Sequence, residues 1–301
     1  MKTPWWFLHK TPLSLVLVPV SLVYYAASRA VYKFRTIGAY TPRRPVVCFG
    51  NILAGGVGKT PIVRAVAHHF DAPVVMRGYK SKSSISGIGD EAAMLSQSGI
   101  QVHTGDRRSN IMLLDRQSSN APIIMDDGFQ NPKIKKTVSV LVFDAALGYG
   151  NGFLLPAGPL REGRRAITRA DAVLIIDAAK NNKNFTIPVG TTIFHAKNKT
   201  INPYGANEKI IAFAGIGYPQ KFFAAIKGNV VATRKFPDHY QYTDADLEKL
   251  FKLADARGAK LLTTEKDWVR LPASAREKIK FAPLETQIDD AFFKWLGDKL
   301  K

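Results

Sequence analysis

Residues 46–60 of this chain read Val46-Val47-Cys48-Phe49-Gly50-Asn51-Ile52-Leu53-Ala54-Gly55-Gly56-Val57-Gly58-Lys59-Thr60. The short apolar run predicts a buried strand, and the glycine-rich loop after it ends in Gly-Lys-Thr before a helix-compatible segment. Glycines let backbone N–H groups surround phosphate oxygens, and the helix N-terminus adds partial positive charge. Lys59 is placed to reach the outer phosphates, and the Thr60 hydroxyl is placed to ligate Mg²⁺. The stretch therefore predicts a phosphate-binding loop.

The loop departs from the common pattern G-x-x-x-x-G-K-[ST] in the position of its glycines. The first glycine of that pattern would fall at Leu53, whereas the glycines of this loop stand at Gly55 and Gly56. A glycine-rich turn with a surface lysine is the alternative interpretation. The strand-like run before the loop and Pro61, tolerated in the first turn of a helix, favour the phosphate loop.

The composition describes a globular, strongly basic protein. Its 301 residues are enough for one large or two modest domains, and 46% of them are hydrophobic. The one cysteine, Cys48, has no partner for an internal disulfide, which is typical of a core residue in a reducing compartment. The net charge of +19 predicts a surface that seeks anions. Nucleic acid, anionic lipid and phosphorylated substrates all satisfy that requirement.

The N-terminal segment distinguishes among these partners. Thr11–Ser28 contains no charged residue and is about as long as a helix that crosses a hydrocarbon core. Trp5-Trp6-Phe7 precedes it and Tyr24-Tyr25 lies near its end, as is typical of membrane interfaces. Basic residues that suit an anionic leaflet follow it: Arg29, Lys33, Arg35, Arg43 and Arg44.

Three interpretations of this segment compete. A cleaved signal peptide is disfavoured, because it would take the nucleotide site out of the cytosol. A spanning anchor and a helix lying in the inner face of the membrane, kinked at Pro12 and Pro19, remain open. Either one predicts that the rest of the protein is held at a membrane surface.

Short apolar runs alternate with helical segments along the rest of the chain. The runs are Ala72–Met76, Ile100–His103, Ala121–Met125, Val138–Phe143 and Ala172–Ile176. This alternation predicts a doubly wound, mainly parallel α/β sheet of the P-loop NTPase type. A second, smaller α/β alternation begins at Ile210. We expect an N-terminal membrane-associated helix over 1–35, a P-loop domain over 36–195, an extended linker over 196–208 and a smaller α/β domain over 209–301.

Two acidic pairs are candidates for chemistry. Asp126 and Asp127 end an apolar run, as in a Walker B strand, which delivers a carboxylate to hold Mg²⁺ beside the phosphate loop. A turn-forming Asp-Asp-Gly is the alternative. Asp90 and Glu91 open a predicted helix. Acidic residues there most often complement the helix dipole, and the more specific interpretation is that one of them is a general base.

Two loops contribute further candidates. His239 lies between a strand and a helix of the second domain, where it is either solvated or in contact with substrate. Arg161, with Arg164 and Arg165, follows a proline-stiffened turn. Arginine forks suit phosphate, and a solvated basic loop is the alternative.

Together these segments resemble the tetraacyldisaccharide 4'-kinase (LpxK) family over nearly the whole chain. Besides the N-terminal helix and the phosphate loop, the resemblance rests on Arg77–Tyr79, Gly89–Glu91, Asp126–Gln130, Leu155–Glu162, Ala212–Gly217, Phe236–His239 and Thr263–Asp267. The family transfers the γ-phosphate of ATP to the 4'-hydroxyl of a tetraacylated glucosamine disaccharide 1-phosphate, a lipid A precursor. The resemblance implies Mg²⁺ as cofactor and the cytoplasmic face of the inner membrane of a Gram-negative type of cell as location.

The resemblance also implies roles for single residues. The catalytic set is Asp90 as base, His239 as its partner, and Lys59. The substrate contacts are Tyr79 and Arg161. The nucleotide loop consists of Gly55, Gly56, Val57, Gly58, Lys59, Thr60 and Pro61, and the metal ligands are Thr60, Asp126 and Asp127.

Asn131 and Leu53 differ in how they compare with the family pattern. Asn131 stands where the family usually has histidine, so an ionisable side chain is not expected there, while Leu53 is shared with the family loop. We expect the lipid and the membrane surface as partners, no nucleic acid, and a monomer.

Two other functions compete with this interpretation. A membrane-bound partitioning-type ATPase has a similar loop, but that family wants a lysine where this chain has Ala54. A basic nucleic-acid-binding ATPase is disfavoured, because no aromatic-rich RNA signature or zinc-type spacing is present.

Overall fold

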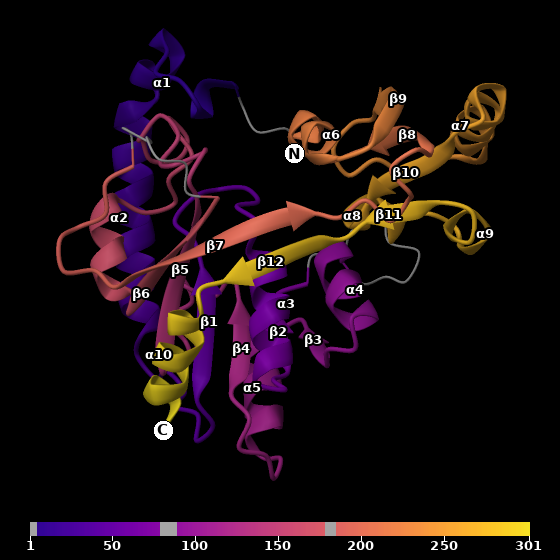
Figure 1. The fold of residues 1–301 in the computed structure, drawn as a ribbon. Coiled ribbons are helices and arrows are strands. Elements are labelled where there is room, and N and C mark those ends of the chain that lie inside the picture. Colours follow the sequence, from indigo (N-terminus) through magenta and orange to yellow (C-terminus); the bar gives the residue numbers. More distant parts are fainter. Residues whose placement is uncertain (1–4, 79–88, 178–184) are drawn as a thin grey trace. The chain divides into compact units, whose positions relative to one another are not determined.

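The computed structural model describes residues 5–78, 89–177 and 185–301 (Figure 1). The chain divides into two compact units. The larger unit comprises Thr3–Arg77, Ser98–Lys197 and Thr286–Lys301, and the smaller one comprises Gly78–Gln97 and Asn198–Glu285 with the first two residues. The chain therefore passes between the units more than once.

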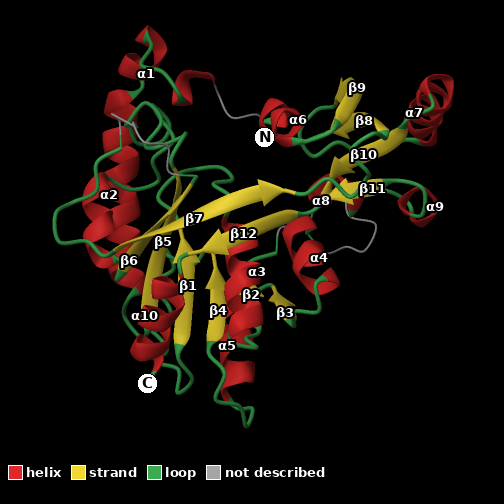
Figure 2. Cartoon of the chain, viewed as in Figure 1, coloured by secondary structure: helices red, strands yellow, loops and turns green. Residues whose placement is uncertain are grey.

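An eight-stranded sheet forms the centre of the larger unit (Figure 2). Its order is β12 (Leu284–Ile288), β7 (Ile193–Thr200), β6 (Ala172–Ile176), β5 (Val138–Asp144), β1 (Val46–Gly50), β4 (Ile123–Asp126), β2 (Val74–Met76) and β3 (Val102–Thr104). The strands from β7 to β3 pair in parallel. This pairing confirms the predicted mainly parallel α/β sheet. The central strands are continuous apolar runs because both faces of the sheet are covered.

The phosphate-loop strand occupies the middle of this sheet. β1 lies between β4 and β5, and Phe49 is in register with Asp126. The carboxyl ends of β1 and β4 therefore meet at one edge. In open parallel sheets, ligands bind outside this edge, where the direction of strand progression reverses.

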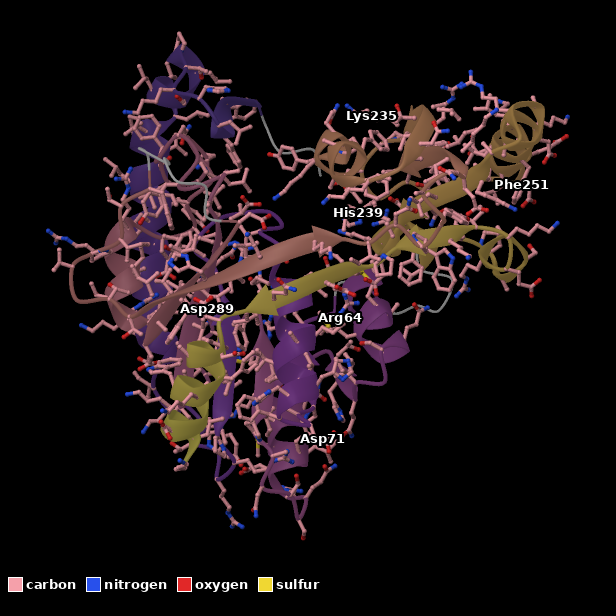
Figure 3. All side chains as sticks on the ribbon, in the orientation of Figure 1. Arg64, Asp71, Lys235, His239, Phe251 and Asp289 are labelled. Carbon is pink, nitrogen blue, oxygen red and sulfur yellow. The ribbon has the colours of Figure 1, made fainter. Side chains whose placement is uncertain are left out.

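The C-terminal helix α10 (Asp290–Leu300) packs on the larger unit. Phe292 is fully buried, with its ring centroid 6.3 Å from that of Phe49 in β1. Phe293 stacks 4.3 Å from His69 at the end of α3 (Lys59–His69). Asp289, labelled in Figure 3, precedes α10. Its side chain accepts a 2.9 Å hydrogen bond from the His195 amide. Because this aromatic face is buried there, α10 belongs to the larger unit. The expected limits 209–301 had assigned it to the smaller domain.

The smaller unit is built on a second parallel sheet. Its order is β11 (Lys280–Ala282), β10 (Lys260–Thr264), β8 (Lys209–Ala214) and β9 (Asn229–Lys235). Alternate residues of β8 enter two separate cores: Ile211 packs with Leu247 of α7 (Asp244–Arg257), and Ile210 packs with Phe222 of α6 (Pro219–Ala225). This confirms a smaller α/β assembly.

Two further segments differ from the expected domain limits. Helix α4 (Asp90–Gln97) belongs to the smaller unit rather than to the domain 36–195, because its buried Asp90 is ion-paired there with Arg270. The expected linker 196–208 begins inside β7, which runs to Thr200.

The N-terminal segment forms a short 3₁₀ turn (Trp5–Phe7) and two helices, α1 (Pro12–Val16) and α2 (Val18–Arg35). The expected single helix is interrupted at Leu17, and Pro19 lies in the first turn of α2. Ser21 is buried and donates a 3.0 Å hydrogen bond to the Leu154 carbonyl. Within the described ranges, none of the helices has both the length and the apolar character needed to cross a membrane.

Candidate active site

The loop after β1 has the backbone geometry of a phosphate cradle. Gly58 precedes α3 as its N-cap with φ 79° and ψ 30°, and Gly55 has φ 115°, conformations that favour glycine. A Cβ atom at Gly55 or Gly56 would meet no heavy atom within 4 Å. The glycines therefore leave the surface of the loop open next to the N-terminus of α3, where an anion is stabilised.

A second segment supports this loop from one side. The Ala54 amide donates to the Pro159 carbonyl at 2.7 Å, and the Arg161 amide donates to the Ile52 carbonyl at 2.7 Å. Leu53 forms an antiparallel bridge with Leu160 and is buried. A glycine is unnecessary at Leu53, because its backbone pairs with another strand-like segment instead of turning around a phosphate.

A carboxylate and two cations lie at this loop, and we call Lys59, Asp127 and Arg161 the Asp127 cluster. Lys59 Nζ is 3.1 Å from Asp127 Oδ1, and Arg161 Nη1 is 3.1 Å from Asp127 Oδ2. Burial acts to raise the pKa of Asp127, but the charges and hydrogen bonds of Lys59 and Arg161 outweigh it and lower the pKa to about 2. The carboxylate is therefore ionised at any working pH.

The turn that carries Asp126 and Asp127 is fixed by backbone contacts. Asp127 has φ 50°, and its amide donates to the Phe49 carbonyl at 2.8 Å. Arg107 Nη2 donates to the carbonyl oxygens of both aspartates, at 2.9 and 3.0 Å. Sequence reasoning missed Arg107, since its only local signal is a place in the first turn of α5 (Arg107–Asp115).

Two glycines allow the same turn to pack closely. A Cβ at Gly128 would lie 2.4 Å from Met125 Cε, and a Cβ at Gly50 would lie 2.5 Å from Phe129 Cβ. Asn131 ends the turn: its side-chain oxygen accepts from the Lys133 amide at 3.0 Å. The side chain at 131 therefore closes a turn, as a neutral amide can.

The oxygen donors near the loop fit a magnesium ion that is held jointly with phosphate. Thr60 lies in the first turn of α3, and the buried Asp126 ends β4 beside Asp127. Among the described residues, no three His, Cys, Asp or Glu side chains are placed to hold a metal by themselves. Mg²⁺ usually takes one or two carboxylates and completes its shell with water and substrate phosphates. The donor set present is of that kind.

The smaller unit contains a second group of charged side chains, which we call the Asp90 cluster: Asp90, His239, Asp267 and Arg270. Asp90 Oδ2 accepts from Arg270 Nη2 at 2.6 Å and lies 3.2 Å from His239 Nδ1. His239, seen beside the ribbon in Figure 3, has φ 58°. Asp90 is buried, which acts to raise its pKa, but hydrogen bonds from His239 and Arg270 and the charge of Arg270 hold the pKa well below its usual range.

The structure thus brings most predicted residues together in two groups, one in each unit. Lys59, Asp127 and Arg161 meet at the phosphate loop, and Asp90 meets His239. Tyr79 lies outside the described residues. Pro61 is buried in the first turn of α3 and Val57 is buried in the loop, so both shape the loop through packing.

A parallel sheet whose central strand ends in an open glycine loop, with a lysine beside a carboxylate, defines a phosphate-loop nucleotide-binding protein. The sequence model of one family, tetraacyldisaccharide-1-P 4'-kinase (LpxK), matches residues 13–301. The chain belongs to this family. Membership confirms the expected enzyme class, a kinase, and favours it over the partitioning-type ATPase.

Individual relatives agree with the family assignment. The tetraacyldisaccharide 4'-kinases of Paramagnetospirillum magneticum and Rhodospirillum rubrum are each 35% identical to this chain. The alignments cover 96% and 98% of this chain, and 94% and 96% of the two relatives. The crystal structure of the "apo" form of LpxK from Aquifex aeolicus in complex with ATP has the same fold, with a TM-score of 0.76 at 24% identity. The structural alignment covers 96% of this chain and 100% of the Aquifex aeolicus chain.

Proposed function

We propose that this protein transfers the γ-phosphate of ATP to the 4'-hydroxyl of a tetraacyl glucosamine disaccharide 1-phosphate. The reaction uses Mg²⁺ and takes place at the cytoplasmic face of the inner membrane. The observation that carries the proposal is the Asp127 cluster at the open glycine loop, in a chain that belongs to a 4'-kinase family. We expect the protein to act as a monomer.

The larger unit supplies the donor side. The amides of Gly55 to Gly58 and the N-terminus of α3 bind the phosphates of ATP. Lys59 and Arg161 lie within reach of one carboxylate and provide positive charge for the transferred phosphoryl group. Thr60, Asp126 and Asp127 would hold Mg²⁺, which neutralises charge on the phosphates when bound.

The smaller unit supplies the acceptor side. Asp90 is an ionised carboxylate whose Oδ1 is buried and makes no hydrogen bond within the described part of the chain. A buried polar atom without a partner costs free energy, so Oδ1 has unused capacity for a hydroxyl donor. Asp90 thus orients the 4'-hydroxyl and accepts its proton as the P–O bond forms. Because the pKa of Asp90 is low, we expect the proton to move late in the reaction. The loose transition state of phosphoryl transfer allows this order.

The N-terminal helices supply the membrane contact. Exposed apolar side chains cover α2 and its end, among them Val23 (71% exposed), Phe34 (75%) and Ile37 (80%). An apolar surface with basic neighbours such as Lys33 and Arg35 suits the interface of an anionic leaflet. Such a contact would hold the enzyme where its lipid substrate resides.

The test is transfer of radiolabel from γ-labelled ATP to the tetraacyl disaccharide 1-phosphate in mixed micelles. Wild-type protein should label the lipid, and Lys59→Ala should lower the rate about 100-fold or more, since the lysine stabilises transition-state charge. Lys252→Ala is the matched control, because Lys252 is an exposed lysine that pairs with its helical neighbour Glu248. ATP hydrolysis without lipid labelling would contradict the proposed acceptor.

A further inference from the structure

The side chain of Arg270 is completely buried in the smaller unit and uses every nitrogen of its guanidinium group. Nε and Nη2 donate to Asp90 Oδ2 at 3.1 and 2.6 Å. Nη1 donates to Asp267 Oδ1 at 3.1 Å and to the Gly215 carbonyl at 3.1 Å. Both of its donors toward Asp90 converge on one carboxylate oxygen, and Oδ1 of that residue accepts no hydrogen bond from the described residues.

Asp267 fixes the position of Arg270. Its Oδ2 accepts from the Thr264 hydroxyl at 2.7 Å and from the Gly215 amide at 3.0 Å. Thr264 ends β10, and Gly215 follows β8, so these contacts attach the ion pair to the carboxyl ends of two neighbouring strands. Gly215 also leaves no spare room, because a Cβ there would lie 3.1 Å from Asp267 Oδ1. The guanidinium is thus held on the rigid part of the unit.

His239 is placed by the same contacts. Its amide donates to the Gly215 carbonyl at 3.0 Å, and its Nδ1 lies 3.2 Å from Arg270 Nη2 and 3.2 Å from Asp90 Oδ2. Asp90 is borne on a different helix, α4, far from these residues in sequence. Arg270 is the residue that touches Asp90, Asp267 and His239 together.

We propose that Arg270, anchored by Asp267, is the positioning residue that orients Asp90 and His239 for the acceptor hydroxyl. The inference rests on the proposed function, in which Asp90 receives the 4'-hydroxyl. By occupying Oδ2, Arg270 directs the hydroxyl to Oδ1. It also supplies the positive charge between two buried carboxylates: it lowers the pKa of Asp90 and opposes the burial that raises the pKa of Asp267.

Among the nearby charges, that of Arg270 lowers the pKa of Asp90 the most, and that of Lys266 lowers it less. Lys266 of α8 (Glu265–Trp268) is ion-paired with Glu91 at 3.5 Å, and Asp238 lies 3.9 Å from His239 Nε2. Tyr242, whose pKa is raised by burial and by the nearby charge of Asp267, is neutral. Removing Arg270 should therefore bring the titration of Asp90 into the neutral range.

The experiment combines kinetics with a titration that needs no activity. Arg270→Gln should lower kcat by roughly 100-fold and give kcat a new acidic limb, because an Asp90 that binds a proton cannot accept one. The KM for ATP should stay within about threefold, since the phosphate loop is untouched. Arg270→Lys keeps the positive charge but loses the two-pronged guanidinium group. Compared with Arg270→Gln, it should restore the pH profile of kcat more fully than the value of kcat.

The titration is followed by ¹³C NMR of aspartate carboxyl groups, with Asp90→Asn to assign the signal. Asp90 should stay ionised down to about pH 4 in the wild type and titrate between about pH 5 and about pH 8 in Arg270→Gln. An unchanged Asp90 titration overturns the inference whether or not the lipid is phosphorylated, whereas failure of wild-type transfer alone overturns the proposed function. If Arg270→Gln does not fold, an Arg270→Lys enzyme with wild-type kcat would also overturn the inference.

The matched control is Arg257→Gln, in the same unit. Arg257 is exposed and donates to the Val231 carbonyl at 3.0 Å, without contact to the Asp90 cluster. Its kcat and pH profile should match the wild type within about twofold, because surface substitutions of this kind act weakly.

Discussion

The Nζ atom of Lys59 lies 3.1 Å from Oδ1 of Asp127, so the lysine that ends the phosphate loop is already neutralised by a carboxylate. Arg161 occupies the other oxygen of Asp127. If Mg²⁺ binds Asp127, as we propose, it would take the place of these ion pairs, and Lys59 and Arg161 would become available to the phosphates of ATP.

This relationship predicts opposite effects of Asp127→Asn with and without metal. Without Mg²⁺, the variant should bind ATP a few-fold more tightly than the wild type, since Lys59 and Arg161 lose the carboxylate that competes with phosphate. With Mg²⁺, transfer should fall by about 100-fold, because a metal ligand is missing. Titration calorimetry with and without Mg²⁺ measures the first effect and the lipid assay the second. Asp298→Asn, an exposed carboxylate paired with Lys301, is the control. Weaker metal-free binding by Asp127→Asn would contradict this account.

The pKa of Asp127 predicts how stability depends on pH. Its folded-state value of about 2 lies below the unfolded value, so the unfolded state takes up the proton first as the pH falls. The ion pairs contribute on the order of 2 kcal/mol above about pH 4, and this is lost as the pH falls toward 2. The difference in free energy of unfolding between wild type and Asp127→Asn should therefore be constant at neutral pH and shrink in acid. Urea unfolding followed by tryptophan fluorescence checks it, and an equal difference at about pH 7 and about pH 3 would exclude this origin.

Close packing at Gly50 and Gly128 predicts large losses of stability on adding one methyl group. Gly50→Ala and Gly128→Ala should each lose about 2 kcal/mol or more, because the new Cβ overlaps Phe129 or Met125. Gly297→Ala is the matched control, and it should raise the free energy of unfolding instead of lowering it. A Cβ at Gly297 meets no atom within 4 Å, and alanine in a helix gains about 0.5–1 kcal/mol over glycine. Thermal unfolding separates the two classes, and equal melting temperatures for all three variants would refute the packing argument.

The exposed face of α2 predicts where membrane binding is lost. Val23→Glu should reduce flotation with anionic vesicles several-fold, because it adds a negative charge to an exposed apolar surface that we propose contacts lipid. Val189→Glu makes the same change at an exposed valine outside the N-terminal helices. If both variants float equally well, the membrane contact does not involve this face of α2.

The sequence predicted the parts of the fold that depend on short-range patterns. Buried parallel strands such as Val46–Gly50 and Ala172–Ile176 are apolar throughout, so they stand out from the polar segments around them. The phosphate loop and Asp126-Asp127 also stand out in the sequence, because glycines and acidic residues directly follow or end apolar runs there.

The remaining features depend on contacts distant in sequence. Asp90 and Arg270 are 180 positions apart, and nothing in either local sequence indicates their pairing. The same contact moves α4 into the smaller unit, just as burial of Phe292 moves α10 into the larger one. Leu53 looked like a departure from the loop pattern because its bridge to Leu160 is invisible in a linear motif.

Cys48 gives the central strand a chemical reporter. It is fully buried in β1, and burial raises the pKa of its thiol to about 11. Thiol reagents attack the thiolate, so alkylation in the native protein has to wait until the strand opens. The sequence holds no other cysteine, and the labelling rate therefore measures opening at one position, two residues from the start of the phosphate loop. Bound nucleotide should slow that rate by stabilising the closed state, which makes alkylation kinetics a route to affinity that needs neither lipid nor turnover.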